Sequence, residues 1–342
     1  MKTQLASLIF LAASIVALPA VPVYFSGKSA DKPKVILSES VKATESSSEK
    51  IEKPDIPDYK GTPYKVLDVS TGKILEVPEI EYVIGAVCAE MPASFDAEAL
   101  KAQAVAAHTY AERQRIRERG KPTEELNGAD FSNDTSKYQG YFTEAQAKQF
   151  FGDGFEENYS KISAAVSEVM PYILTYEDEP IISAFHSMSA GKTESAENAW
   201  GAAVDYLVSV DSSSDKSAPK YLEEVRYKKD VLKHKLESAF PGITLDGDFS
   251  KWLNVTSVSD SGTVLTASAG DKTVTGNDIR TALSLRSACF EIRYEGEEAV
   301  IATKGYGHGV GMSQYGANSM ASEGKTWREI LEHYYPGCKI SK

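Results

Sequence analysis

The chain of 342 residues carries 37 Lys and Arg against 49 Asp and Glu, a net charge of −12, and 42% of its residues are hydrophobic. This globular composition excludes a wholly disordered or fibrous chain, and the length favours roughly two domains. The acidic balance repels phosphate backbones, so nucleic acid is excluded as a general partner. Three cysteines are too few for a disulfide framework or a four-thiolate zinc site, and the sequence leaves open whether Cys289 and Cys338 pair.

The amino-terminal segment is predicted to enter a membrane. Leu5 to Phe25 is free of charge and about long enough to cross a bilayer as a helix. The alternative is a cleaved signal peptide, but a small-x-small cleavage site is hard to place, since Leu18 stands two residues before Ala20. We therefore expect residues 1–25 to form an uncleaved single-pass anchor, and both interpretations place the rest of the chain outside the cytoplasm.

Residues 26–60 differ in composition from what precedes and follows them. Ser, Lys, Glu and Pro dominate, as in the run Glu45–Lys50. Such a stretch cannot bury enough apolar surface to offset its ordering entropy, so we expect a flexible linker. Residues 61–342 have globular composition throughout and are expected to form one domain.

Apolar periodicity in the first half of the globular part predicts a hairpin followed by helices. Alternating apolar runs flank Thr71-Gly72, which is typical of a hairpin turn. Apolar residues then recur at helical spacing until Met91-Pro92, because the residue before a proline avoids helical angles. The next helix is alanine-rich, and its small-residue face indicates the buried central helix. The expected elements are a hairpin over 64–77, helices over 80–90, 96–119 and 162–169, and strands over 172–176 and 181–185.

The second half predicts a smaller helix and hairpin insertion before a well-defined last helix. Thr326 and Glu329 form a capping-box pattern ahead of an apolar stripe, and Pro336-Gly337 ends that helix. The mixture lacks regular alternation of strand and helix, so the predicted class is α+β, a mixed domain around the alanine-rich helix. The expected elements are a helix over 220–240, hairpins over 253–267 and 290–303, and a helix over 327–334.

Familiar catalytic patterns are absent from the sequence. Gly191-Lys192-Thr193 lacks the first glycine of a phosphate loop, and the alternating glycines after residue 304 do not match a dinucleotide fingerprint. No zinc-protease histidine spacing and no Gly-x-Ser-x-Gly elbow occurs. The chemistry must therefore be sought in other segments.

Glu90 is the first candidate, because it ends an apolar helix just before a proline. The partial negative charge of a helix C-terminus and apolar neighbours both disfavour an ionised carboxylate and raise its pKa, as a general acid requires. The alternative is a solvated helix-end residue. In the next helix Lys101 and His108 lie near one face, followed by Tyr110. Such a stripe is, by itself, more often solvated than functional.

Two loops complete the set of candidates. The segment Phe185–Glu194 holds His186, Lys192 and several hydroxyls among small residues, which suits contact with a polar ligand. The alternative is an ordinary capped turn, which has the same composition. In Gly305–Ala317, glycines at every second position surround His308 and leave the backbone reachable. Ser313 could cap the helix that follows. A structural turn rarely needs so many glycines around one histidine, which favours function.

Together, the segments AEMP, EALKAQAVAA followed by TYA, GYGHGVGMSQYGA and YYPG resemble the stage II sporulation protein D family, which also includes amidase-enhancer proteins. The resemblance extends from about residue 81 to residue 337. It implies lytic cleavage of peptidoglycan glycan strands during engulfment in sporulation, with Glu90 as the catalytic acid. Glu90 would protonate the oxygen between N-acetylmuramic acid and N-acetylglucosamine, and the muramyl C6 hydroxyl would attack C1 to give a 1,6-anhydro end.

The same resemblance implies partners and a location. Peptide-free glycan strands, prepared by a partner cell-wall amidase, would be the substrate, and another membrane sporulation protein would join the complex. The protein would sit in the cell membrane, with its catalytic domain in the intermembrane space facing the forespore septum. No cofactor is implied. A non-catalytic peptidoglycan-binding module that stimulates an amidase is the alternative.

Matching positions extend the resemblance to individual residues. Many members have arginine where this chain has His108, which leaves the role of that position open. Some members bind zinc through cysteines near His186 and before Gln139; no cysteine stands there in this chain, so we expect no metal. The candidate substrate-binding residues are Lys101, His108, Tyr110, His186, Ser187, Ser189, Lys192, His308, Ser313 and Gln314.

Overall fold

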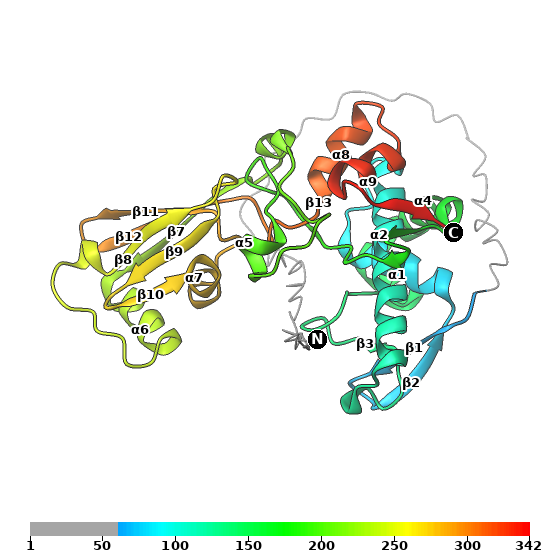
Figure 1. Ribbon diagram of the computed structural model, residues 1–342, viewed down its shortest axis with the longest axis horizontal. Coiled ribbons are helices and arrows are strands. Elements are labelled where there is room, and N and C mark those ends of the chain that lie inside the picture. The colour runs from blue at the N-terminus through cyan, green and yellow to red at the C-terminus, as the bar shows by residue number, and fades with distance from the viewer. Residues whose placement is uncertain (1–60) are drawn as a thin grey trace, which may run out of the picture.

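The computed structural model describes residues 61–342 (Figure 1). The expected anchor over residues 1–25 and linker over 26–60 lie outside the described residues. Within 61–342, no helix combines the length and apolar character that a bilayer crossing requires.

Helices packed around one central helix make up the first lobe (Figure 1). The central helix is α2 (Ala97–Gly120), as its alanine content predicted, and its buried alanines allow the neighbouring helices to approach closely. The helices around it are α1 (Glu79–Glu90), α4 (Phe155–Val169), α8 (Gln314–Ser322) and α9 (Trp327–Tyr334). Helix α3 (Glu144–Phe151) packs against α4.

Small sheets border this helical core. The predicted hairpin is confirmed as β1 (Tyr64–Asp68) and β2 (Lys73–Val77), and β3 (Phe131–Ser132) runs parallel to β1. A second sheet joins β4 (Ile173–Tyr176) to β5 (Glu179–Pro180) and β14 (Lys339–Ser341). The short strands β6 (Phe185–His186) and β13 (Met312–Ser313) pair in parallel. That pair joins the two loops that the sequence singled out.

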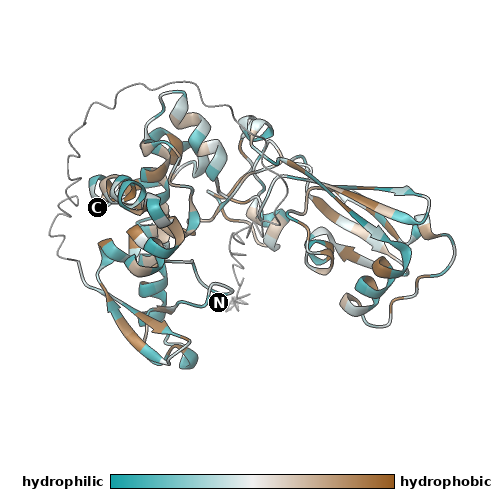
Figure 2. Cartoon of the chain, turned by 180° about the vertical axis from the view of Figure 1, so that it is seen from behind, coloured by the Kyte–Doolittle hydropathy of each residue, from teal (hydrophilic) through white to brown (hydrophobic). Residues whose placement is uncertain are grey.

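The second lobe has a hydrophobic core of its own, so the insertion is larger than the helix and hairpin expected from sequence. Its buried core includes Leu232, Trp252, Ile279 and Ile301, and Figure 2 shows apolar stretches on the elements of both lobes. Its strands form the sheets β10-β9-β8 and β11-β12-β7. The elements are β7 (Leu222–Lys228), α6 (Lys229–Ala239), β8 (Leu253–Val258), β9 (Val264–Ala269), β10 (Lys272–Thr275), α7 (Gly276–Leu283), β11 (Phe290–Glu295) and β12 (Glu298–Lys304).

Two expected elements differ in the structure. The helix over 220–240 begins only at Lys229, because residues 222–228 form β7, which pairs along its whole length with β12. Its Glu, Arg and Lys side chains favour a helix locally, and the partner strand overrides that preference. The strand over 181–185 is wrong except at Phe185. The hairpins of the second lobe and the capping box of α9 are confirmed.

Candidate functional site

Glu90 is the last residue of α1, and the residue as a whole is half-buried. Its Oε1 accepts a hydrogen bond from the backbone N–H of Gly140 at 3.0 Å, and no ion pair joins Glu90 within residues 61–342. Burial raises the pKa of Glu90 to about 7, and the bond from Gly140 opposes this only in part. A substantial fraction of the Glu90 carboxyl groups therefore stays protonated near neutral pH. Burial, rather than the charge of the helix end, is the main cause.

The segment that encloses Glu90 is held by two buried tyrosines. The hydroxyl of Tyr110 accepts a hydrogen bond from the backbone N–H of Gln139 at 3.2 Å. The side-chain amide of Gln139 lies 3.5 Å from the hydroxyl of Tyr82. A Cβ added at Gly140 would lie 3.1 Å from Oε1 of Glu90, so glycine permits the close approach. Tyr110 therefore positions the Gln139–Gly140 segment. Its buried hydroxyl is hydrogen-bonded inside the protein, rather than exposed for contact with a ligand.

Gln314 links Glu90 to the glycine-rich loop. Its Nε2 donates to the backbone carbonyl of Glu90 at 2.9 Å and lies 3.4 Å from Oε1 of Gln103. Gln314 begins α8, whose N-cap is Ser313, as the sequence predicted: the Ser313 hydroxyl accepts from the backbone N–H of Gly316. The start of α8 is thus fixed against the end of α1.

His186 and His308 lie side by side next to Trp200, the last residue of α5 (Ala196–Trp200). The ring centroid of His308 is 5.7 Å from that of His186 and 5.8 Å from that of Trp200. Burial lowers the pKa of His186 to about 4 and that of His308 to about 3, so both rings are neutral at pH 7. Trp200 and His308 are half-buried. The group therefore consists of uncharged rings, two of which belong to residues that are not fully buried.

The serine hydroxyls predicted to contact a ligand are used inside the protein. Ser189 donates to Oδ2 of the fully buried Asp215 at 2.6 Å, and Ser313 donates to Oδ1 of the same carboxylate at 2.8 Å. The backbone carbonyl of Ser187 accepts from Tyr315 N–H at 3.0 Å. Asp215 therefore holds the two loops together, and Ser189 and Ser313 have structural contacts. The side chain of Ser187 is half-buried.

The glycines around His308 serve the packing of the two loops. Gly307 has φ +115°, and a Cβ there would lie 2.7 Å from Cβ of His186. Gly311 has φ +72°, and its Cβ would lie 2.0 Å from the carbonyl oxygen of Ala184. Both positions need glycine for backbone conformation and for contact with the His186 segment. The sequence interpretation, that bare backbone is kept free for a ligand, does not account for these two glycines.

The two candidate lysines lie in different environments. Nζ of Lys101 lies 2.8 Å from Oε1 of Glu98 and 2.5 Å from Oε2 of Glu168, and Glu98 also accepts from the backbone N–H of Trp327. Lys101 therefore ties α2 to α4 and, through Glu98, to α9. Lys192 is exposed, so its ammonium group is accessible to a ligand.

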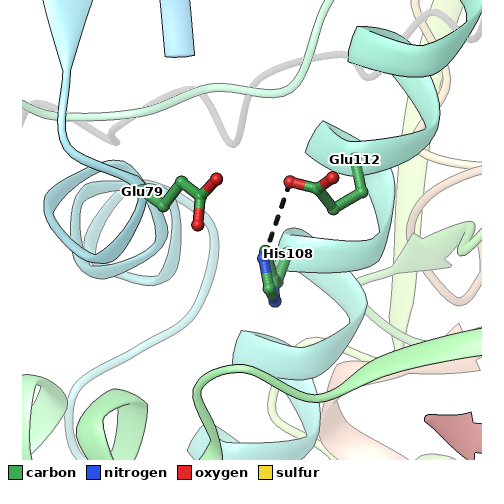
Figure 3. Close-up of side chains that lie close together, drawn as sticks. All are labelled: Glu79, His108 and Glu112. Carbon is green, nitrogen blue, oxygen red and sulfur yellow. Dashed lines mark ion pairs between the residues drawn. The ribbon is translucent and has the colours of Figure 1, made fainter. Parts of the chain in front are cut away.

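His108 belongs to a separate polar cluster, shown in Figure 3 with Glu79 and Glu112. Its Nδ1 donates to the carbonyl of Tyr172 at 3.0 Å, and its Nε2 lies 3.7 Å from Oε1 of Glu112. The ligand atoms of the three residues lie within 4.8 Å of one another, a spacing that a metal ion could use. Arg115, however, pairs with both carboxylates, at 2.7 Å and 2.5 Å. Arg115 thus already occupies both carboxylates that a metal ion would need.

Several residues near Glu90 and the histidines were not among the sequence candidates. Gln103, Gln139 and Gly140 carry no local signal, because only long-range packing brings them to Glu90. Trp200 could have been identified from the sequence as a site candidate, because it is a large aromatic residue shortly after the polar loop. Cys88 is buried in the core, and burial raises the pKa of its thiol to about 12, so the thiol stays protonated.

The raised pKa of Glu90 predicts a pH-dependent stability. Between its ordinary pKa of 4.5 and the folded value of about 7, the folded state holds a proton that the unfolded chain has lost. Stability is therefore lost as pH rises through this window. We expect the advantage of Glu90→Gln over the wild type to grow by about 2 kcal/mol between pH 5 and pH 8. Urea unfolding at both pH values measures it. Glu81→Gln, exposed on the same helix, controls for the lost charge, and an equal change in both variants would contradict the expectation.

Comparisons with known proteins agree with the resemblance drawn from the motifs. The family model described as "Stage II sporulation protein" matches residues 68–176. Stage II sporulation protein D of Bacillus subtilis (strain 168) is 37% identical over 338 residues, which cover 99% of this chain and 94% of that protein. Stage II sporulation protein D of Bacillus amyloliquefaciens is 40% identical over 288 residues, 84% of this chain and 81% of that protein.

A more distant relative is the "Amidase enhancer" of Bacillus subtilis (strain 168). It is 27% identical over 313 residues, covering 75% of this chain and 40% of the relative. The identities and coverage of the two sporulation proteins, together with the matched family model, show the family. The chain belongs to the stage II sporulation protein D family.

Proposed function

We propose that this protein is a peptidoglycan lytic transglycosylase that cleaves the bond between N-acetylmuramic acid and N-acetylglucosamine in peptide-free glycan strands during engulfment. The observation that carries the proposal is the carboxyl group of Glu90, a half-buried residue: it has no ion-pair partner within residues 61–342, and burial raises its pKa to about 7. A carboxylic acid protonated near neutral pH is suited to general acid catalysis.

The proposed reaction needs one carboxyl group. Glu90 gives its proton to the glycosidic oxygen, and the bond from that oxygen to C1 of the muramyl residue breaks. The C6 hydroxyl of the same residue attacks C1, and its proton passes to the Glu90 carboxylate, which restores the acid. Because the nucleophile belongs to the substrate, no second carboxylate is needed to activate water, in contrast to most glycoside hydrolases.

The surroundings of Glu90 support this role. Tyr110 and Gly140 fix the segment that desolvates the carboxyl group, and Gln314 fixes the backbone of Glu90 itself. His308 and Trp200 offer neutral ring surface suited to the apolar face of a sugar. Exposed Lys192 and half-buried Ser187 supply polar groups for the strand.

The proposal extends to partners and location, which membership of the family suggests. We propose that residues 1–25 anchor the protein in the cell membrane and that residues 61–342 act outside the cytoplasm, in the intermembrane space facing the forespore septum. A cell-wall amidase would strip the peptides and another membrane sporulation protein would share the complex. The distant relative named an amidase enhancer fits an association with an amidase.

Incubation of the full chain with peptide-free glycan strands, followed by mass analysis of the strand ends, tests the proposal. We expect 1,6-anhydro ends, formed at a rate that falls as pH rises through about 7, because the ionised Glu90 cannot donate a proton. Hydrolytic reducing ends would overturn the intramolecular attack. Strands that bind but stay intact would instead favour a non-catalytic module that stimulates an amidase, which the name of the distant relative also suits.

A further inference from the structure

Arg280 on α7 is a half-buried cation without a counter-ion among the described residues. Its side chain is half-buried, and its Nε is enclosed with no hydrogen-bond partner. No carboxylate of residues 61–342 lies within ion-pair distance of it. Desolvation lowers the pKa of Arg280, which shows that its charge is disfavoured where it stands. Proteins seldom keep an uncompensated guanidinium in such a place, because an unpaired charge is costly to withdraw from water.

The nearby carboxylate does not compensate Arg280. Both Glu194 and Arg280 act electrostatically on the thiol of Cys289. Glu194, however, is hydrogen-bonded to Ser259, Ser261 and Asn198. Glu194 is therefore hydrogen-bonded to hydroxyl and amide donors and forms no ion pair with Arg280.

Arg280 is on α7, at the junction of the two lobes, where α7 contacts the end of α5 next to Trp200. The charge of Arg280 contributes to the lowered pKa of both His186 and His308. Asn277, on the same face of α7, donates to the carbonyl of Ala199, which precedes Trp200. Figure 1 shows α7 next to α5 at this junction. His186 is also connected to Glu90. It pairs with Ser313 in the β6–β13 pair, and the next residue, Gln314, donates to the backbone carbonyl of Glu90.

The ligand that fits is an acidic sugar. The neutral rings of Trp200 and His308 offer surface for a sugar ring and carry no charge that could bind an anion. The guanidinium has a planar fork of donors that matches a carboxylate. Its terminal nitrogens are not among the enclosed unpaired atoms. In a glycan strand, a free carboxylate occurs on the lactyl group of each muramyl residue once its peptide has been removed.

We propose that Arg280 binds the lactyl carboxylate of peptide-free N-acetylmuramic acid and so selects strands from which the peptide has been removed. The inference rests on the proposed function for the identity of the glycan. An intact stem peptide converts this carboxylate to a neutral amide, which cannot compensate the guanidinium. Arg280 is thus a specificity-determining residue, distinct from the acid Glu90.

Binding measurements test the proposal separately from cleavage. The full chain carrying Glu90→Gln is titrated with peptide-free glycan strands and with the same strands after conversion of their carboxylates to methyl amides. We expect the free acid to bind about tenfold more tightly, as for one charge-assisted hydrogen-bonded pair. Adding Arg280→Gln should reduce the difference to less than about twofold. Adding Arg226→Gln, whose partners are Glu295 and Glu298, removes the same charge and should keep the difference.

A stability measurement distinguishes this role from a structural one. Because the charge of Arg280 is uncompensated, we expect the ligand-free Arg280→Gln variant to unfold at the same temperature as the wild type or higher. A preference for the free acid that survives Arg280→Gln, or no preference in any variant, would overturn the proposal. So would a large fall in unfolding temperature with loss of binding to both strands. If binding depends on Arg280 but the wild type forms no anhydro ends, the proposed function is wrong and the Arg280 site is still supported.

Discussion

Replacement of Glu90 by glutamine is expected to lower the rate of 1,6-anhydro end formation by about 10²–10⁴-fold, the usual contribution of a positioned general acid. Glutamine keeps the volume of the side chain and an acceptor for the Gly140 N–H. Its amide is too weak an acid to protonate the glycosidic oxygen. Binding of peptide-free strands should change little, because the substitution leaves the packing of the Gly140 segment intact. Single-turnover mass analysis of strand ends measures the rate, and titration measures binding.

Glu81→Gln is the matched control, since it changes the same residue type on the exposed side of the same helix. Its rate should equal that of the wild type. Unchanged end formation in Glu90→Gln would rule out Glu90 as the acid. A parallel loss of rate and binding would mean that Glu90 holds the strand rather than protonates it.

Gly311→Ala is expected to destabilise the protein by at least about 4 kcal/mol, among the larger effects of a single substitution. The new Cβ would lie 2.0 Å from the carbonyl oxygen of Ala184. That oxygen cannot easily move away, because it accepts from the backbone N–H of Met312 at 3.0 Å and from the hydroxyl of Tyr335 at 2.7 Å. The clash would separate β6 from β13 and displace Gln314 from Glu90. Urea unfolding measures the loss.

Gly72→Ala separates the steric clash from the cost of the backbone conformation. Gly72 has φ +68°, close to the +72° of Gly311, but a Cβ there meets nothing within 4 Å. Its replacement should cost only about 1 kcal/mol, the cost of a left-handed conformation for alanine. If the two substitutions destabilise the protein equally, the contact with Ala184 contributes nothing and the packing role of Gly311 is wrong.

Sequence patterns predicted the elements whose signals are local. The capping box of Thr326 and Glu329, the turn at Thr71-Gly72 and the alanine face of α2 each depend on residues a few positions apart, and each is present in the structure. Strand β7 was mistaken for helix because its pairing partner, β12, lies more than 70 residues further along the chain. No local propensity encodes that partner.

For the candidate site, the sequence by itself determined which residues could be chemically active and that Glu90 ends a helix before a proline. Only the tertiary structure decided which of them are free to act. Burial in the folded protein raises the pKa of Glu90, against the opposing hydrogen bond from Gly140, 50 residues away. Asp215 accepts hydrogen bonds from the hydroxyls of Ser189 and Ser313. Desolvation and hydrogen-bond partners depend on atoms brought together from distant segments, whereas a motif records only the order of side chains along the chain.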